Sequence, residues 1–162
     1  MAGGRAVRSR VGHAFIKALM REEKAIFAGE LSGHYYYRDM GYADNGLLTM
    51  VLVANILAAS GQTLSELIRP LERYPSTGEI NLAVRDPSAV LAVLEARYRD
   101  ADLDHLDGLT IGYPTWWFNI RPSHTEPVVR LNLEAETRDL MDGKVQEVLS
   151  VIRTADPAAR EV

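Results

Sequence analysis

The sequence has no cysteine, which excludes disulfide bonds, thiolate metal ligands and cysteine nucleophiles. It has no apolar run long enough to cross a membrane, and no continuous apolar stretch follows its basic N-terminus, MAGGRAVRSR, as it would in a signal peptide. The formal net charge of −4 lacks the basic excess that nucleic-acid-binding proteins usually carry. We therefore expect a cytoplasmic protein whose partners are neither membranes nor nucleic acids.

The residues that are present have the balance of a globular protein, with 47% hydrophobic and 25% charged residues. The 162 residues suffice for one ordinary domain, or for a small domain with part of another. The stretch RYPSTGE, residues 73–79, concentrates turn-forming residues between two regions with clear hydrophobic patterns. We place a domain boundary there, with residues 1–74 before it and 75–162 after it.

Residues 75–162 predict a small antiparallel four-stranded sheet covered on one side by two helices. Among Trp116, Trp117 and Phe118, alternation along a strand places at least one side chain in the core, and we expect most of them there. Pro87 suits the first turn of a helix. The expected strands are EINLAV, LTIGY, WWFNIR and PVVRLNLEA, and the expected helices span residues 87–98 and 137–153.

Residues 1–74 predict three helices but only two short strands, which is a partial α/β layer that looks truncated. The helix expected over residues 44–60 begins at Asp44, a capping type of residue, and is apolar nearly all round, so we expect it to be buried. The incomplete sheet would leave unpaired edges, which a second copy of the chain could pair with in a homodimer. The fold class of the chain is therefore α+β. The other helices are expected at 11–23 and 63–71, the latter with Thr63 and Glu66 in capping-box spacing, and the strands at 25–28 and 34–38.

The segment RPSHTEP, between two predicted strands, has the residues of an anion site. Arg121 offers a planar fork of donors that suits phosphate oxygens, and Ser123 and Thr125 add hydroxyl donors. The alternative is a polar turn with one exposed arginine. Ser123 followed by His124 also has the pattern of a nucleophile beside a base, but neighbouring side chains on an extended chain point apart. We therefore favour phosphate binding for Ser123.

The segment GELSGH predicts a tight turn after a buried strand, in which Glu30 and Ser32 alternate and face the same side. A carboxylate there can accept hydrogen bonds from two neighbouring sugar hydroxyls, although an ordinary turn with a solvated Glu30 is the alternative. His13 lies near a helix start, where an imidazole can move protons near neutral pH, unless its role is structural. No metal-ligand spacing relates it to the other histidines, at positions 34, 105 and 124.

Two charge patterns are interpreted as solvated surface. Asp100, Asp102 and Asp104 have D-x-D-x-D spacing, but a calcium-binding loop would have Gly in place of His105 and Glu in place of Ile111. We therefore expect a solvated loop between a helix and a strand, and no metal site in this chain. The arginines at positions 5, 8 and 10 are expected at the solvated edge or start of a strand.

Several of these motifs occur together in the order of a known family. VGHAFIKALM, GELSGHYYYRD, GEINLAV and LDGLTIGYPTWWFNIRPSHTEPVVRLNLEA together resemble the α-D-phosphohexomutases, among them the bacterial phosphomannomutase/phosphoglucomutase enzymes. The resemblance runs from about residue 8 to residue 152. It implies a four-domain enzyme that interconverts 1-phospho and 6-phospho sugars through a phosphoserine with Mg²⁺. This chain would supply the end of domain three and all of domain four.

The resemblance also implies roles for single residues. Glu30 and Ser32 would bind sugar hydroxyls, and His13 would lie near the reacting centre. Arg121, Ser123, His124 and Thr125 would hold the phosphate that does not react, although the family usually has Asn or Gly in place of His124. The segment 73–79 would be a hinge.

The serine and metal loops of the family are absent from this sequence, so the resemblance implies a chain that binds mannose or glucose phosphates, needs no Mg²⁺ itself and is inactive alone. The alternatives are a standalone phosphosugar-binding or dimerising module and a phosphomannose-specific enzyme with Ser123 as nucleophile.

Overall fold

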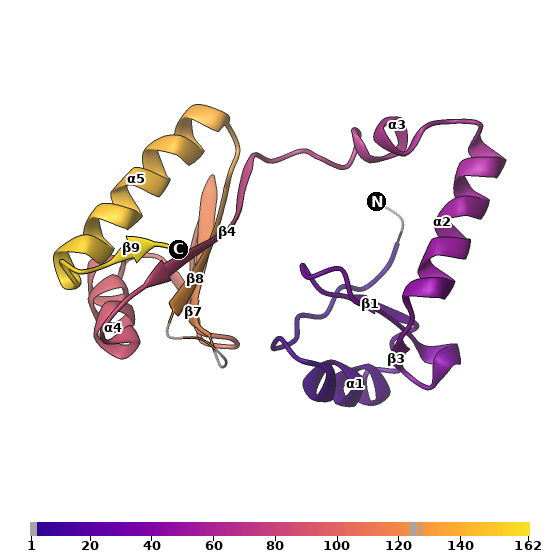
Figure 1. Cartoon of the computed structure of the whole chain (residues 1–162), viewed down its shortest axis with the longest axis horizontal. Coiled ribbons are helices and arrows are strands. Elements are labelled where there is room, and N and C mark those ends of the chain that lie inside the picture. The colour runs from indigo at the N-terminus through magenta and orange to yellow at the C-terminus, as the bar shows by residue number, and fades with distance from the viewer. Residues whose placement is uncertain (1–2, 124–125, 127) are drawn as a thin grey trace. The chain divides into compact units, whose positions relative to one another are not determined.

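The structure is a computed structural model that describes residues 3–123, 126 and 128–162. It divides into two compact units, Met1–Leu71, called unit 1, and Glu72–Val162, called unit 2 (Figure 1). Each unit combines helices with an antiparallel sheet, so the predicted α+β class is confirmed. Within the described ranges, no helix has the length and apolarity to cross a membrane.

Unit 1 is a three-stranded antiparallel sheet with helices, and its strand order is β1-β2-β3. A small core forms where Ile16 and Met20 of the first helix pack against Tyr36 of the middle strand. The elements are α1 (His13–Glu22), β1 (Phe27–Gly29), β2 (Tyr35–Tyr37), the 3₁₀ turn η1 (Arg38–Met40), β3 (Ala43–Asp44), α2 (Gly46–Ser60) and α3 (Leu64–Ile68).

Helix α2 differs from its prediction in two respects. Its cap is Asn45, whose side chain accepts a hydrogen bond from the Leu48 N–H at 2.9 Å, and Asp44 belongs to β3 instead. The prediction that α2 is buried was wrong: none of its residues is buried, and Leu47 is 75% exposed. An apolar surface on every side requires cover on every side, and the described part of unit 1 does not supply it. The capping box of Thr63 and Glu66 at α3 is confirmed.

Unit 2 is a six-stranded antiparallel sheet, not the four-stranded one predicted, with strand order β5-β6-β7-β8-β4-β9. The two additional strands lie at the edges and are too short to show alternation. Asp102 and Asp104 belong to one of them and pair with β6, so the prediction of a solvated loop was wrong for these residues. The elements are β4 (Ser76–Ala83), α4 (Pro87–Arg97), β5 (Asp102–Asp104), β6 (Leu109–Tyr113), β7 (Trp116–Pro122), β8 (Val128–Ala135), α5 (Arg138–Ala155) and β9 (Arg160–Glu161).

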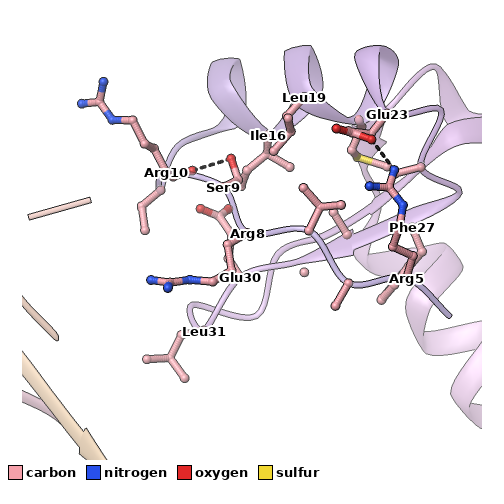
Figure 2. Close-up of a pocket in the computed structure, with 17 residues that line it drawn as sticks. Arg5, Arg8, Ser9, Arg10, Ile16, Leu19, Glu23, Phe27, Glu30 and Leu31 are labelled. Carbon is pink, nitrogen blue, oxygen red and sulfur yellow. Dashed lines mark hydrogen bonds and ion pairs between the residues drawn. The ribbon is translucent and has the colours of Figure 1, made fainter. Parts of the chain in front are cut away.

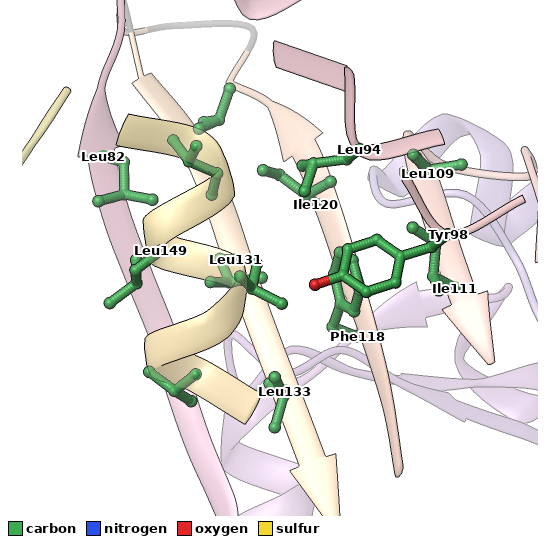
Figure 3. Packing of buried hydrophobic residues seen from close by; sticks show 14 of the residues in the cluster. Leu82, Leu94, Tyr98, Leu109, Ile111, Phe118, Ile120, Leu131, Leu133 and Leu149 are labelled. Atoms are coloured by element: carbon green, nitrogen blue, oxygen red, sulfur yellow. The ribbon is translucent and has the colours of Figure 1, made fainter. Parts of the chain in front are cut away.

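The core of unit 2 lies between the sheet and the helices α4 and α5 (Figure 3). Alternation along β7 places Trp116 and Phe118 in this core and leaves Trp117 37% exposed on the other face, as predicted. Tyr98, at the end of α4, packs edge-on against Phe118 and donates a hydrogen bond to the carboxylate of Glu147 at 3.1 Å. The amphipathic helix α5 contributes Met141, Val145, Val148, Leu149 and Ile152.

Candidate functional site

The GELSGH segment forms the tight turn that joins β1 to β2. The Glu30 N–H donates to the carbonyl of His34 at 2.9 Å, and the Gly33 N–H donates to the carbonyl of Glu30 at 3.0 Å. Gly33 has a φ of 83°, a left-handed conformation that glycine adopts without strain. This geometry fixes the backbone on both sides of Ser32.

The carboxylate of Glu30 is held from two sides. Its Oε1 accepts a hydrogen bond from the Gly12 N–H at 3.2 Å, and its Oε2 accepts one from the Tyr36 hydroxyl at 2.6 Å. A tyrosine phenol is protonated at neutral pH and donates this bond, and burial and the bond itself raise the pKa of Tyr36 further. A carboxylate oxygen has two lone pairs, so each oxygen of Glu30 retains capacity for a second donor.

The fold brings together residues that spacing along the sequence does not relate. His13 Nδ1 lies 3.4 Å from Asp44 Oδ1, and the rings of His13 and His34 meet edge to face with centroids 5.2 Å apart. Ser32 Oγ and His34 Nδ1 share a hydrogen bond of 2.9 Å. Spacing along the sequence did not relate His13 to His34, and the fold places their rings in contact. The sequence signal for part of this arrangement is the two-residue spacing of Ser32, His34 and Tyr36, which on an extended chain places their side chains on the same side.

A pocket of about 460 Å³ lies between the N-terminal segment, α1 and β1, and Glu30 lines it (Figure 2). Arg5 forms an ion pair with Glu23, and the Arg10 guanidinium lies 4.4 Å from the ring centroid of Phe15. The predicted strand does not form in this segment. Arg5 and Arg10, which line the pocket, are therefore both engaged with neighbouring side chains.

The RPSHTEP segment joins β7 to β8 in unit 2. The Ser123 N–H donates to the carbonyl of Val128 at 2.8 Å, and Ser123 Oγ accepts a hydrogen bond from the Glu126 N–H at 3.3 Å. This pattern is that of a serine that stabilises its own turn. The predicted ligands His124 and Thr125 lie outside the described residues, so the structure does not test the nucleophile–base pattern.

Arg121 belongs to a network that sequence reasoning missed. It lies directly opposite Arg130 in the register of β7 and β8. Between them, the carboxylate of Glu79 lies 3.3 Å from Arg121 Nη2 and 3.4 Å from Arg130 Nη1. Facing like charges repel on a sheet, so the bridging carboxylate stabilises the pair. The Arg121 side chain is 16% exposed, and among the described atoms Arg130 Nε is buried without a hydrogen-bond acceptor. An anion is thus already the partner of these two guanidiniums.

Family models match both units. Residues 1–74 match the model described as phosphoglucomutase/phosphomannomutase, alpha/beta/alpha domain III, and residues 79–151 match that of the phosphoglucomutase/phosphomannomutase C-terminal domain. The chain belongs to the phosphoglucomutase/phosphomannomutase family.

Individual members of this family are similar along almost the whole chain. A phosphomannomutase of Methanocaldococcus jannaschii is 43% identical over 154 residues, which are 95% of this chain and 34% of the relative. A phosphomannomutase of Escherichia coli is 42% identical over 155 residues, 93% of this chain and 34% of that protein. The crystal structure of a phosphoglucomutase/phosphomannomutase family protein from Burkholderia thailandensis is similar, with a TM-score of 0.78 and 31% sequence identity. The match covers 98% of this chain and 34% of the Burkholderia chain. The chain thus spans about a third of the length of these relatives.

Mg²⁺, which the resemblance to the phosphohexomutases implies, does not fit the groups of convergent donors found among the described residues. Magnesium prefers an octahedron of oxygen ligands. Asp100 accepts a hydrogen bond from the Tyr113 hydroxyl at 3.0 Å, and Asp104 accepts one from the Leu106 N–H at 2.8 Å. In the described ranges, the one group of three convergent donors consists of His13, His34 and Asp44, which is rich in nitrogen.

The Glu79 bridge leads to a test by anion rescue. We expect Glu79→Gln to lower the free energy of unfolding of unit 2 by about 1 kcal/mol, because the facing guanidiniums lose the charge between them. Inorganic phosphate should then raise the Tm of the variant more than that of the wild type, because it replaces the lost carboxylate. Fluorescence of the two tryptophans, both in unit 2, follows this unfolding.

Glu126→Gln is the matched control, because Glu126 lies 3.3 Å from the same Arg130 but its side chain is 62% exposed. An exposed ion pair contributes little, so this variant should stay within about 0.5 kcal/mol of the wild type. If phosphate raised the Tm of Glu79→Gln and of the wild type equally, phosphate would not bind between the two guanidiniums in place of the Glu79 carboxylate.

Proposed function

We propose that this chain is the substrate-gripping portion of a phosphohexomutase that interconverts hexose 1-phosphates and 6-phosphates through a phosphoserine. Unit 2 holds the phosphate that does not react, and unit 1 binds sugar hydroxyls. A hexose phosphate carries both groups. Mannose and glucose phosphates are the proposed substrates.

The loop between β7 and β8 carries this proposal. Arg121 lies near the end of β7, just before this loop and opposite Arg130, and its guanidinium already pairs with a carboxylate. The loop backbone is closed by the bond from the Ser123 N–H to Val128, and the proposed ligands Ser123, His124 and Thr125 follow in sequence. Charge-assisted hydrogen bonds contribute about 1.5–3 kcal/mol each, so a few of them suffice to anchor a dianion.

The turn between β1 and β2 supports the second half of the proposal. Glu30 is fixed by Gly12 and Tyr36, so little side-chain entropy remains to be lost when a sugar binds. Two adjacent hydroxyls can donate to its two oxygens, and Ser32, two residues further along the same turn, is exposed. His13 follows Gly12, whose N–H binds this carboxylate, and is the proposed accessory group for proton transfer.

Such gripping residues act on catalysis indirectly. Contacts to the spectator phosphate and to the hydroxyls supply binding energy at a distance from the reacting atoms, which orients the rest of the sugar. The family's serine and metal loops are not in this sequence, and no other residue here is assigned as the phosphoryl carrier. We therefore expect the chain alone to bind its ligand without turning it over.

Titration of the full chain with mannose 6-phosphate, followed by amide chemical shifts, tests the proposal. We expect shifts at Arg121 and Ser123 and also at Glu30 and Ser32. Inorganic phosphate should shift only the first pair. Unshifted amides at Arg121 and Ser123 would remove the phosphate role, and robust mutase turnover by the pure chain would remove the assignment as a binding portion.

A further inference from the structure

In the group formed by His13, His34 and Asp44, only His13 has a role in the proposed function. One donor atom from each residue lies within 4.8 Å of the other two, and the three residues come from the start of α1, the end of the β1–β2 turn and β3. We propose that these residues form a binding site for a late first-row divalent transition metal, with Zn²⁺ as the reference ion.

The donor set decides the class of metal. Two imidazoles and one carboxylate suit Zn²⁺, Co²⁺ and Ni²⁺, whereas Mg²⁺ and Ca²⁺ prefer oxygen ligands only. In a tetrahedral zinc site with bonds of about 2.0–2.1 Å, neighbouring ligand atoms lie about 3.3 Å apart. The distance of 3.4 Å from His13 Nδ1 to Asp44 Oδ1 matches this value. Three protein ligands leave a fourth position for water or a ligand.

The surroundings restrain the donor residues. The hydrogen bond between Ser32 Oγ and His34 Nδ1 restrains the His34 ring. Asp44 pairs with the fully buried Tyr36 in the register of β2 and β3, and the Tyr36 ring lies edge to face with that of His13 at 5.3 Å. All three donor side chains are at least partly exposed, so an ion reaches them from solvent.

The charges around the group also favour a cation. Asp44 is one of the ligands, and the carboxylate of Glu30 lies 3.8 Å from His34 Nδ1. A metal bound here lies beside Ser32 and Glu30 and would compete with sugar hydroxyls. This competition rests on the proposed function, but metal binding itself does not.

Calorimetric titration of the full chain with Zn²⁺ in a weakly coordinating buffer tests the site, and Co²⁺ titration adds a visible absorption that reports its coordination. We expect one ion per chain, no comparable heat from Mg²⁺, and at least a tenfold weaker affinity in His13→Ala and in Asp44→Asn. Circular dichroism of both variants establishes that they fold. If one variant does not fold, the Zn²⁺ affinity of the other variant tests the site.

His105→Ala is the matched control, because His105 is similarly exposed and lies 3.4 Å from a carboxylate of Glu95, but has no third donor in the described part of the chain. It should bind Zn²⁺ as the wild type does. Wild-type affinity in folded His13→Ala and Asp44→Asn, or an equal loss in His105→Ala, would overturn the proposal. These outcomes leave the phosphate-binding assignment untouched, since no sugar or phosphate is present.

Discussion

Replacing Arg121 by alanine should weaken the binding of mannose 6-phosphate or glucose 6-phosphate to this chain by about one to two orders of magnitude. The side chain belongs to the end of β7, just before the proposed phosphate loop, and is 16% exposed, so its charge is poorly screened by water. Glu79 holds one edge of the guanidinium, which orients the planar fork before a ligand arrives. Calorimetry of wild type and variant measures the change.

Two further variants sharpen this result. Arg121→Lys should lie between wild type and Arg121→Ala, because it keeps the charge and loses the fork. Arg153→Ala is the control: Arg153 is half exposed on α5 and pairs with Glu161, so its removal should leave the affinity unchanged. Equal affinities of Arg121→Ala and the wild type would show that the phosphate binds elsewhere.

The largest effect on stability is expected for Phe118→Ala. Phe118 is fully buried in β7, stacks on Trp116 with centroids 5.8 Å apart and meets Tyr98 edge to face at 5.4 Å. Its loss removes buried apolar surface and leaves a cavity, at a cost of about 3–5 kcal/mol. For a unit of this size the Tm should fall by more than about 12 °C. Chemical denaturation of unit 2, followed by tryptophan fluorescence, measures the free energy.

Val93→Ala serves as the comparison for this variant. Val93 lies on α4 and is 41% exposed, so its truncation should change the free energy of unfolding by no more than about 0.5 kcal/mol. A loss below 1 kcal/mol for Phe118→Ala would contradict the packing described for unit 2.

The sequence predicted unit 2 well because its patterns are local. Alternation along β7 placed Trp116 and Phe118 in the core, and the 3.6-residue period of α5 identified its packed face. The edge strands β5 and β9 were missed because strands of three and two residues show no period. They exist because neighbouring strands offer free backbone groups, which the sequence of the edge itself does not reveal.

Helix α2 shows where local pattern misleads. An apolar surface all round predicts burial, but burial depends on which other surfaces are present to cover it. The described residues of unit 1 leave Leu47 and its neighbours exposed. The sequence predicted that α2 is a helix whose apolar side chains favour contact with other apolar surfaces. It did not predict which surface would make that contact.

By itself, the sequence determined the α+β class, the order of most elements and the family resemblance, because these depend on periodicity and on motifs within short segments. Tertiary structure alone decided that Glu79 bridges Arg121 and Arg130, across three strands, and that His13 meets His34 and Asp44. These residues are distant in sequence, and strand register and the docking of α1 place them together. Charges and metal ligands act through space, so their partners appear only when the chain is folded.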